Sequence, residues 1–151
     1  MILAVMATPL TLSDYQALAE LRHQIRCFLH FSEQAARAQG VEPRQHQLML
    51  ALKGLPAGVR PGIGKLAERL QLQHHSTVEL VNRLSARGLV RRSRDAKDRR
   101  EVLLSLTPKG ERKLRELSLQ HKSELRAQGP ALVNALERAM RPVRHSTRST
   151  T

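Results

Sequence analysis

Basic side chains are concentrated in one short stretch of the sequence, between Arg83 and Arg100. This basic segment holds eight arginines and lysines and two acids, Asp95 and Asp98, for a net charge of +6, whereas residues 1–40 have a net charge of zero. Guanidinium groups bind phosphate through paired hydrogen bonds and stay charged at physiological pH. The segment therefore predicts a surface that binds a polyanion, with nucleic acid as the first candidate and an anionic membrane surface as the second.

A helix expected after Gln73 places polar side chains beside this segment. Its apolar positions recur at helical spacing and define a buried side, formed by Thr77, Leu80, Val81 and Leu84. The opposite side, which we call the recognition face, consists of His74, His75, Ser76, Glu79, Asn82 and Arg83. Serine and histidine reach base edges in a major groove, and arginine binds guanine or phosphate there. An ordinary solvated helix face is the alternative interpretation.

A β-hairpin is expected next, from the stretches "LVRRS" and "REVLLSL" around the polar turn "RDAKDR". Charged residues surround this turn: Arg94, Lys97, Asp98, Arg99 and Arg100. A narrow minor groove favours an inserted arginine, because arginine is less strongly hydrated than lysine. A solubilising loop is the alternative. We interpret Arg87, Arg91 and Arg92 as phosphate or solvent contacts, which position a protein on DNA without specifying sequence.

The elements that position these residues predict a winged helix-turn-helix core over residues 43–106. Pro43 begins one helix, Ile63 to Leu70 form a short second helix, and three residues separate it from the helix after Gln73. Long helices flank this core at 13–39, with Ser13 as the expected cap, and at 107–141, with an expected break at Gly129-Pro130. Residues 142–151 are polar and basic, and we expect them to form a disordered tail.

The fold class expected is mainly α (α+β), a single domain over residues 1–151 with N- and C-terminal dimerisation helices. The apolar stripes of the flanking helices exceed what so small a core can cover, and a second copy would bury them. An intrachain bundle without a dimer is the alternative.

The amino-acid composition further narrows the class of protein. The formal net charge is +13, aromatic residues make up 2% of the chain, and Leu and Ala supply a core typical of helical proteins. Cys27 is the single cysteine, which excludes an intrachain disulfide framework and fits a reducing compartment. No stretch reaches the length of a membrane span, so we expect a cytoplasmic protein with no membrane partner.

The stretch "IGKLAERLQLQHHSTVELVNRLSARGLVRRSRDAKDRREVLLSLTPKGERKL" resembles the MarR family of winged-helix transcription regulators. Four features carry the resemblance: "LAERL" at 66–70, the pattern VxxLxxxGLVxR at 81–92, "DRR" at 98–100 and "LTPKG" at 106–110. The resemblance implies a homodimer that binds a palindromic operator in double-stranded DNA and is released by a small-molecule effector of unknown identity, or by an oxidant. It also implies that Arg100 enters the minor groove, with Asp98 orienting it.

The resemblance further implies an effector pocket, for which Phe28, Phe31, His46 and Met49 are candidates, although they are equally well explained as plain core. Cys27 lies where oxidant-sensing members carry a cysteine, and Arg26, His23 and His30 are close to it in the sequence. A buried structural cysteine is the alternative.

Metal and catalytic chemistry are not expected. His74 and His75 are adjacent on a helix and point about 100° apart, and no cysteine or carboxylate cluster completes a metal site. No phosphate loop or nucleophile motif appears, so we expect no enzyme and no cofactor. The leading hypothesis is a dimeric, sequence-specific DNA-binding repressor released by a small ligand. The alternatives are an oxidant-sensing regulator that uses Cys27 and a non-specific nucleic-acid-binding protein.

Overall fold

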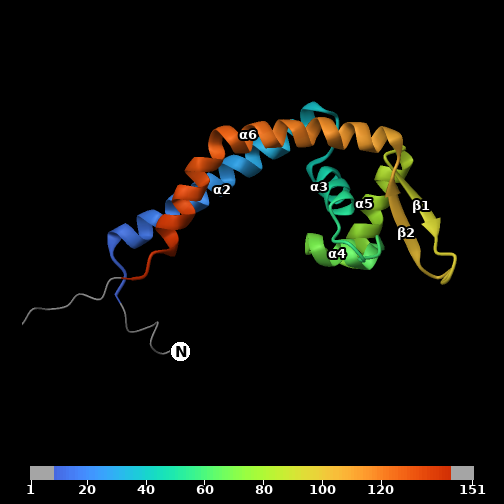
Figure 1. Ribbon diagram of the computed structural model, residues 1–151, viewed down its shortest axis with the longest axis horizontal. Coiled ribbons are helices and arrows are strands. Elements are labelled where there is room, and N and C mark those ends of the chain that lie inside the picture. The colour runs from blue at the N-terminus through green and yellow to red at the C-terminus, as the bar shows by residue number, and fades with distance from the viewer. Residues whose placement is uncertain (1–8, 144–151) are drawn as a thin grey trace, which may run out of the picture. The chain divides into compact units, whose positions relative to one another are not determined.

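The computed structural model describes residues 9–143 of the 151-residue chain. The chain forms two compact units: a terminal unit made of Met1–Phe31 and Lys122–Thr151, and a central unit made of Ser32–His121. The two longest helices, α2 (Leu12–Ala38) and α6 (Pro108–Met140), contribute residues to both units. The central unit also contains three shorter helices and a two-stranded sheet (Figure 1).

The predicted helix-turn-helix is confirmed in the central unit. It is formed by α4 (Ile63–Leu70) and α5 (His74–Ala86), which pack with α3 (Pro43–Lys53). Gln71 ends α4 in a left-handed conformation with φ of 54°, the only positive φ among the described residues other than glycine. The chain therefore reverses within three residues, and the Thr77 hydroxyl then donates to the carbonyl of Gln73 to close the first turn of α5.

The wing is also confirmed, as an antiparallel hairpin of β1 (Val90–Arg94) and β2 (Val102–Leu106). Val90 pairs with Leu106 and Arg94 with Val102, so the register is fixed along the whole ladder. The loop before α4 covers the outer edge of β2, because the Leu104 amide donates to the Pro61 carbonyl at 2.8 Å and Gly62 bridges to Leu103. A covered edge cannot pair with another chain.

The core of the central unit joins the helix-turn-helix to the wing and to the start of α6. Its fully buried members include Leu48, Met49, Leu66, Val81, Leu84 and Leu89. Gly110 lets α6 approach closely, since a Cβ built there would lie 2.0 Å from the Leu89 carbonyl oxygen. Thr107 caps α6 by accepting from the Gly110 amide at 3.0 Å, while its hydroxyl donates to the Gly88 carbonyl at 2.5 Å.

The terminal unit corrects two sequence predictions. Thr11, and not Ser13, caps α2: its hydroxyl accepts from the Asp14 amide, and Asp14 accepts from the Thr11 amide at 2.7 Å. The expected break at Gly129-Pro130 is wrong, because α6 continues through Pro130 to Met140. Proline removes one amide donor and usually kinks a helix. Here Leu132 and the buried Ala135 continue the apolar stripe beyond it, so packing offsets the local cost. Most of the predicted tail, residues 144–151, lies outside the described residues.

Candidate nucleic-acid interface

The recognition face of α5 points away from the core. Thr77, Leu80, Val81 and Leu84 are buried, as the periodicity predicts. On the other side Ser76 is half-buried, and the remaining members of the face are exposed: His74, His75, Glu79, Asn82 and Arg83. A helix anchored on one side with a polar opposite side has the geometry needed to enter a major groove.

Two hydrogen-bonded pairs organise the recognition face. Arg83 donates to the Glu79 carboxylate at 2.9 Å, and the guanidinium of Arg92, on β1, donates to the side-chain oxygen of Asn82. Exposed pairs of this kind are worth about 0.2–1 kcal/mol. They are therefore easily exchanged for bases or phosphates, and the second pair links the recognition helix to the wing.

The tip of the wing is shaped by its two aspartates. The Asp95 carboxylate accepts from the Lys97 amide at 3.1 Å, and the Asp98 carboxylate accepts from the Arg100 amide at 3.0 Å. These are local bonds from an aspartate to the backbone two residues on, which stabilise turns. Asp98 thus holds the backbone of Arg100. The structure shows no bond from Asp98 to the guanidinium, contrary to what the resemblance implied, and among the described residues that guanidinium makes no hydrogen bond.

Arg60 fixes the base of the wing, a role that sequence analysis missed. Its guanidinium pairs with Asp95 and, at 3.1 Å, with Glu101, two acids on either side of the basic tip. The sequence held one signal for this role. Asp95 and Glu101 flank a strongly basic turn, and their carboxylates could be expected to pair with a cation from another part of the chain. Arg94 adds a bond across the tip to the Arg99 carbonyl at 2.8 Å.

Arg87 does not lie free for a phosphate, contrary to our prediction. Its guanidinium donates to the side-chain oxygen of Gln45 at 2.9 Å and to the carbonyl of Gly40 at 2.5 Å. The prediction failed because the partners lie more than forty positions earlier in the sequence. Of the residues interpreted as backbone contacts, Arg91 is exposed and Arg92 is bound to Asn82.

A histidine pair lies in the central unit, with one ring buried and the other half-buried. The rings of His46 (α3) and His121 (α6) are 4.9 Å apart. His121 bonds to the Leu117 carbonyl at 2.6 Å and to the Ser32 hydroxyl at 2.7 Å. His46 is 1% exposed, and its Nδ1 has no hydrogen-bond partner among the described residues. Burial, followed by the charge of His121, lowers the pKa of His46 from 6.5 to about 4.

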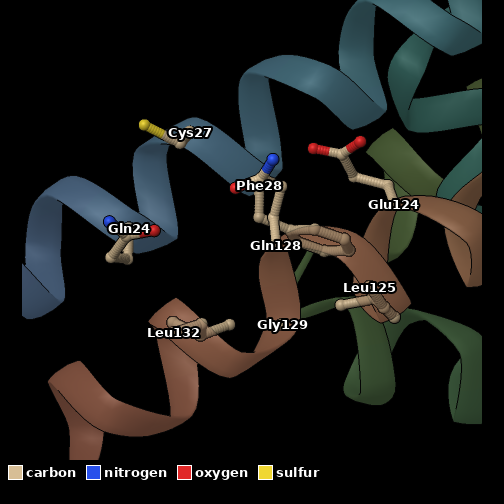
Figure 2. Close-up of a pocket in the computed structure, with 8 residues that line it drawn as sticks. All are labelled: Gln24, Cys27, Phe28, Glu124, Leu125, Gln128, Gly129 and Leu132. Atoms are coloured by element: carbon tan, nitrogen blue, oxygen red, sulfur yellow. The ribbon is translucent and has the colours of Figure 1, made fainter.

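The four candidate pocket residues are not brought together in one cavity. Phe28 lines a cavity of about 300 Å³ in the terminal unit, with Gln24 and Cys27 from α2 and five residues of α6: Glu124, Leu125, Gln128, Gly129 and Leu132 (Figure 2). His46 and Met49 are buried core residues of the central unit, and Phe31 is half-buried. Cys27 is exposed, with its Sγ 3.6 Å from Nε2 of His23.

Other site chemistries find no support in the described part of the chain. Within residues 9–143 there is no group of three histidines, cysteines or acids that could hold a metal ion. None of the helices described is long and apolar enough to cross a membrane.

Comparison with known proteins gives the same architecture. A family model for the MarR family matches residues 39–101. The HTH-type transcriptional repressor MdtR of Bacillus subtilis (strain 168) is 32% identical over 79 residues, which cover 52% of this chain and 49% of MdtR. The chain spans between 44% and 52% of the length of the curated relatives it matches.

Solved structures extend the likeness to the flanking helices. AbsC, a MarR family transcriptional regulator from Streptomyces coelicolor, superposes with a TM-score of 0.71 at 21% identity, covering 89% of this chain and 94% of AbsC. The transcriptional repressor CouR bound to a 23-mer DNA duplex gives a TM-score of 0.61 at 26% identity, covering 80% and 88%. CouR from Rhodococcus jostii RHA1 bound to p-coumaroyl-CoA gives 0.62 at 24% identity, covering 78% and 83%.

A helix-turn-helix with an exposed polar second helix, followed directly by a basic hairpin, defines a winged helix-turn-helix protein. Two further observations narrow the class within the winged helix-turn-helix proteins. Long helices precede and follow the core in the sequence, and a family model matches residues 39–101. Over residues 39–101 the chain matches the model of the MarR family, and its fold is the one seen in AbsC, a MarR family transcriptional regulator.

Proposed function

We propose that the protein is a sequence-specific regulator of transcription that binds double-stranded DNA through its central unit. The observation that carries the proposal is the placement of the recognition face beside the wing in one compact unit, with Arg92 linking the two. In this arrangement α5 enters a major groove. The Arg100 guanidinium, which bonds to no described residue, enters the adjacent minor groove. CouR, a relative solved on a DNA duplex, supports the proposal.

The protein acts as a homodimer through its terminal unit. Ten of the twelve exposed large apolar side chains among the described residues belong to this unit, including Tyr15, Leu18, Leu29, Val133 and Met140. Exposed apolar surface on this scale marks an interaction site. A twofold dimer presents two recognition helices, so the operator is palindromic, with half-sites about one helical turn apart.

The regulator is a repressor that a small ligand releases from its operator. MdtR is named a repressor, and CouR is a repressor solved with p-coumaroyl-CoA. The cavity beside Phe28 offers an apolar floor from Leu125 and Leu132 with polar groups around it, the usual composition of a small-molecule site. A second mode of release is oxidation of Cys27, which is supported by its exposure and by the nearby His23 imidazole.

The proposal is tested by selecting genomic fragments with the purified protein and measuring binding by fluorescence anisotropy at about 150 mM salt. We expect two protomers per site and a preference for the selected duplex over a shuffled one of about a thousandfold. His75→Ala should reduce this preference, whereas Gln47→Ala, at an exposed position of α3, should not. Equal, salt-sensitive binding to both duplexes would instead identify a non-specific nucleic-acid-binding protein.

The mode of release is tested on the same complex. Loss of binding after peroxide treatment, absent in Cys27→Ser, would identify an oxidant sensor. Loss on adding a small organic compound, with the preference of Cys27→Ser unchanged, would identify a ligand-released repressor.

A further inference from the structure

Arg87 lies at the C-terminal end of the recognition helix and is bonded on both its side chain and its backbone. Its two terminal nitrogens donate to different groups, Nη1 to the Gln45 side chain at 2.9 Å and Nη2 to the Gly40 carbonyl at 2.5 Å. Its own carbonyl accepts from the Lys109 ammonium at 3.2 Å. One residue thus connects the end of α2, the start of α3, the end of α5 and the start of α6.

The partners of the guanidinium are themselves held in place. Gln45 is 4% exposed, and its side-chain oxygen also accepts from the Glu42 amide, completing the capping box of α3. Gly40 has a φ of +72° in the turn after α2, a conformation that favours glycine. The Lys113 ammonium donates to the neighbouring Gln39 carbonyl at 3.0 Å, so α6 fixes the same turn from a second position.

An arginine is required for this connection. The two acceptors lie on different elements, and a planar fork of donors reaches both with one side chain, whereas a lysine ammonium is a single point of attachment. Arg87 is therefore an exposed arginine of the basic segment whose donors are committed to the protein itself.

Because Arg87 lies at the C-terminal end of α5, a change in its bonds can tilt the helix and displace the N-terminal end. Thirteen residues of helix span about 20 Å, so a tilt of roughly 10° about the C-terminal end moves the N-terminal end by about 3 Å. His74, His75 and Ser76 lie at that N-terminal end. Base-edge hydrogen bonds need heavy atoms within about 3.2 Å, so such a movement breaks them.

We propose that Arg87 is a positioning residue for operator recognition, which sets the angle of α5 and makes no contact with DNA phosphate. The inference rests on the proposed function, because it concerns how the recognition face meets an operator. It separates Arg87 from Arg91, a neighbouring exposed arginine with no hydrogen bond or ion pair among the described residues. Charge alone does not distinguish the two.

The test compares Arg87→Ala with the matched control Arg91→Ala, on the selected operator and on a shuffled duplex, over a range of salt concentrations. Arg87→Ala should weaken operator binding about tenfold or more while leaving binding to the shuffled duplex and the salt slope unchanged. Arg91→Ala should weaken both complexes and reduce the slope by about two, since each protomer of a dimer loses one phosphate contact. A reduced slope for Arg87→Ala would overturn the inference, since it would show a lost phosphate contact.

Two further variants separate positioning from a merely structural role. Arg87→Lys keeps the charge, so it should fold and bind the shuffled duplex normally but recover only part of the operator affinity. Gln45→Ala combined with Arg87→Ala should weaken operator binding no more than Arg87→Ala alone, because both changes remove the bond between Arg87 and Gln45. Gln45→Ala also removes the bond to the Glu42 amide, and the cost of that loss should appear in the unfolding midpoint. A lower unfolding midpoint with unchanged operator affinity in both Arg87 variants would overturn the positioning role.

Different measurements would refute the proposed function and the positioning role of Arg87. A wild-type protein that binds operator and shuffled duplex equally would refute sequence-specific recognition. The salt slope on the shuffled duplex would still show whether Arg87 contacts phosphate.

Discussion

Acidification should destabilise the central unit through His46. Its pKa is lowered from 6.5 to about 4 by burial and by the charge of His121, so the folded protein binds this proton less readily than the unfolded chain. Stability from the neutral ring is therefore fully present above pH 6.5 and is lost as the pH falls towards 4. Lowering this pKa from 6.5 to about 4 corresponds to about 3 kcal/mol, since each tenfold change in proton affinity is worth about 1.4 kcal/mol. Solvent screens this contribution little, because His46 is 1% exposed.

The assay is urea unfolding of the wild type, His46→Phe and His75→Gln at pH values between 7 and 4.5. Phenylalanine fills the site beside His121 without a titratable group and without the unpartnered Nδ1. The free energy of unfolding should fall with pH about 2 kcal/mol less in His46→Phe than in the wild type. His75→Gln, at an exposed position, should follow the wild type. Parallel curves for the wild type and His46→Phe would refute the assignment of this pH dependence to His46.

Three further substitutions test the packing, the wing and the terminal unit. Gly110→Ala should cost about 1–3 kcal/mol in urea unfolding, because its Cβ would meet the Leu89 carbonyl, while Gly64→Ala, in open space, should cost nothing or stabilise. Arg100→Ala should reduce the preference for the selected operator about tenfold in anisotropy titrations, more than Lys97→Ala does, and equal losses would remove the special role of Arg100. Leu18→Glu should shift the protein to monomer in sedimentation equilibrium. Leu50→Glu, at a similarly exposed position on α3, should leave a dimer. If both variants stayed dimeric, the terminal unit would not be the interface.

Local patterns in the sequence were sufficient to predict the elements of the central unit. The spacing of Thr77, Leu80 and Leu84 predicted the buried side of α5, and alternation around Leu104 predicted the second strand of the wing. Both signals arise from neighbours in the sequence, which is why they survive in the folded protein. Gly129-Pro130 shows the limit of such reasoning, since the continuation of α6 depends on packing partners that are distant in sequence.

The hydrogen-bond partners of the site's side chains could not be predicted from the sequence. Asp98 bonds to a backbone amide two residues away, and Arg87 bonds to Gln45 and Gly40, more than forty residues away. An arginine in a basic segment looks the same whether it faces solvent, a carbonyl or a phosphate. Only the folded arrangement decides which acceptor it reaches first.

That arrangement also divides the cations of the basic segment into those that are free and those that must give up a partner before they bind DNA. Four of its eight basic side chains are already bonded within the described structure: Arg83, Arg87, Arg92 and Arg94. The other four side chains make no hydrogen bond or ion pair with a described residue: Arg91, Lys97, Arg99 and Arg100.

Each phosphate neutralised contributes about 0.9 to the salt slope. If a dimer uses these four side chains on each protomer, the basic segment contributes a slope of about −7, and if it used all eight it would contribute about −14. Alanine at all four free positions should remove most of the slope on a shuffled duplex. A slope that survived this change would show that the bonded arginines exchange their partners for phosphate. Because the bonds of Arg83 and Arg92 are to exposed side chains and those of Arg87 are to a buried amide and a backbone carbonyl, the first two would exchange before Arg87.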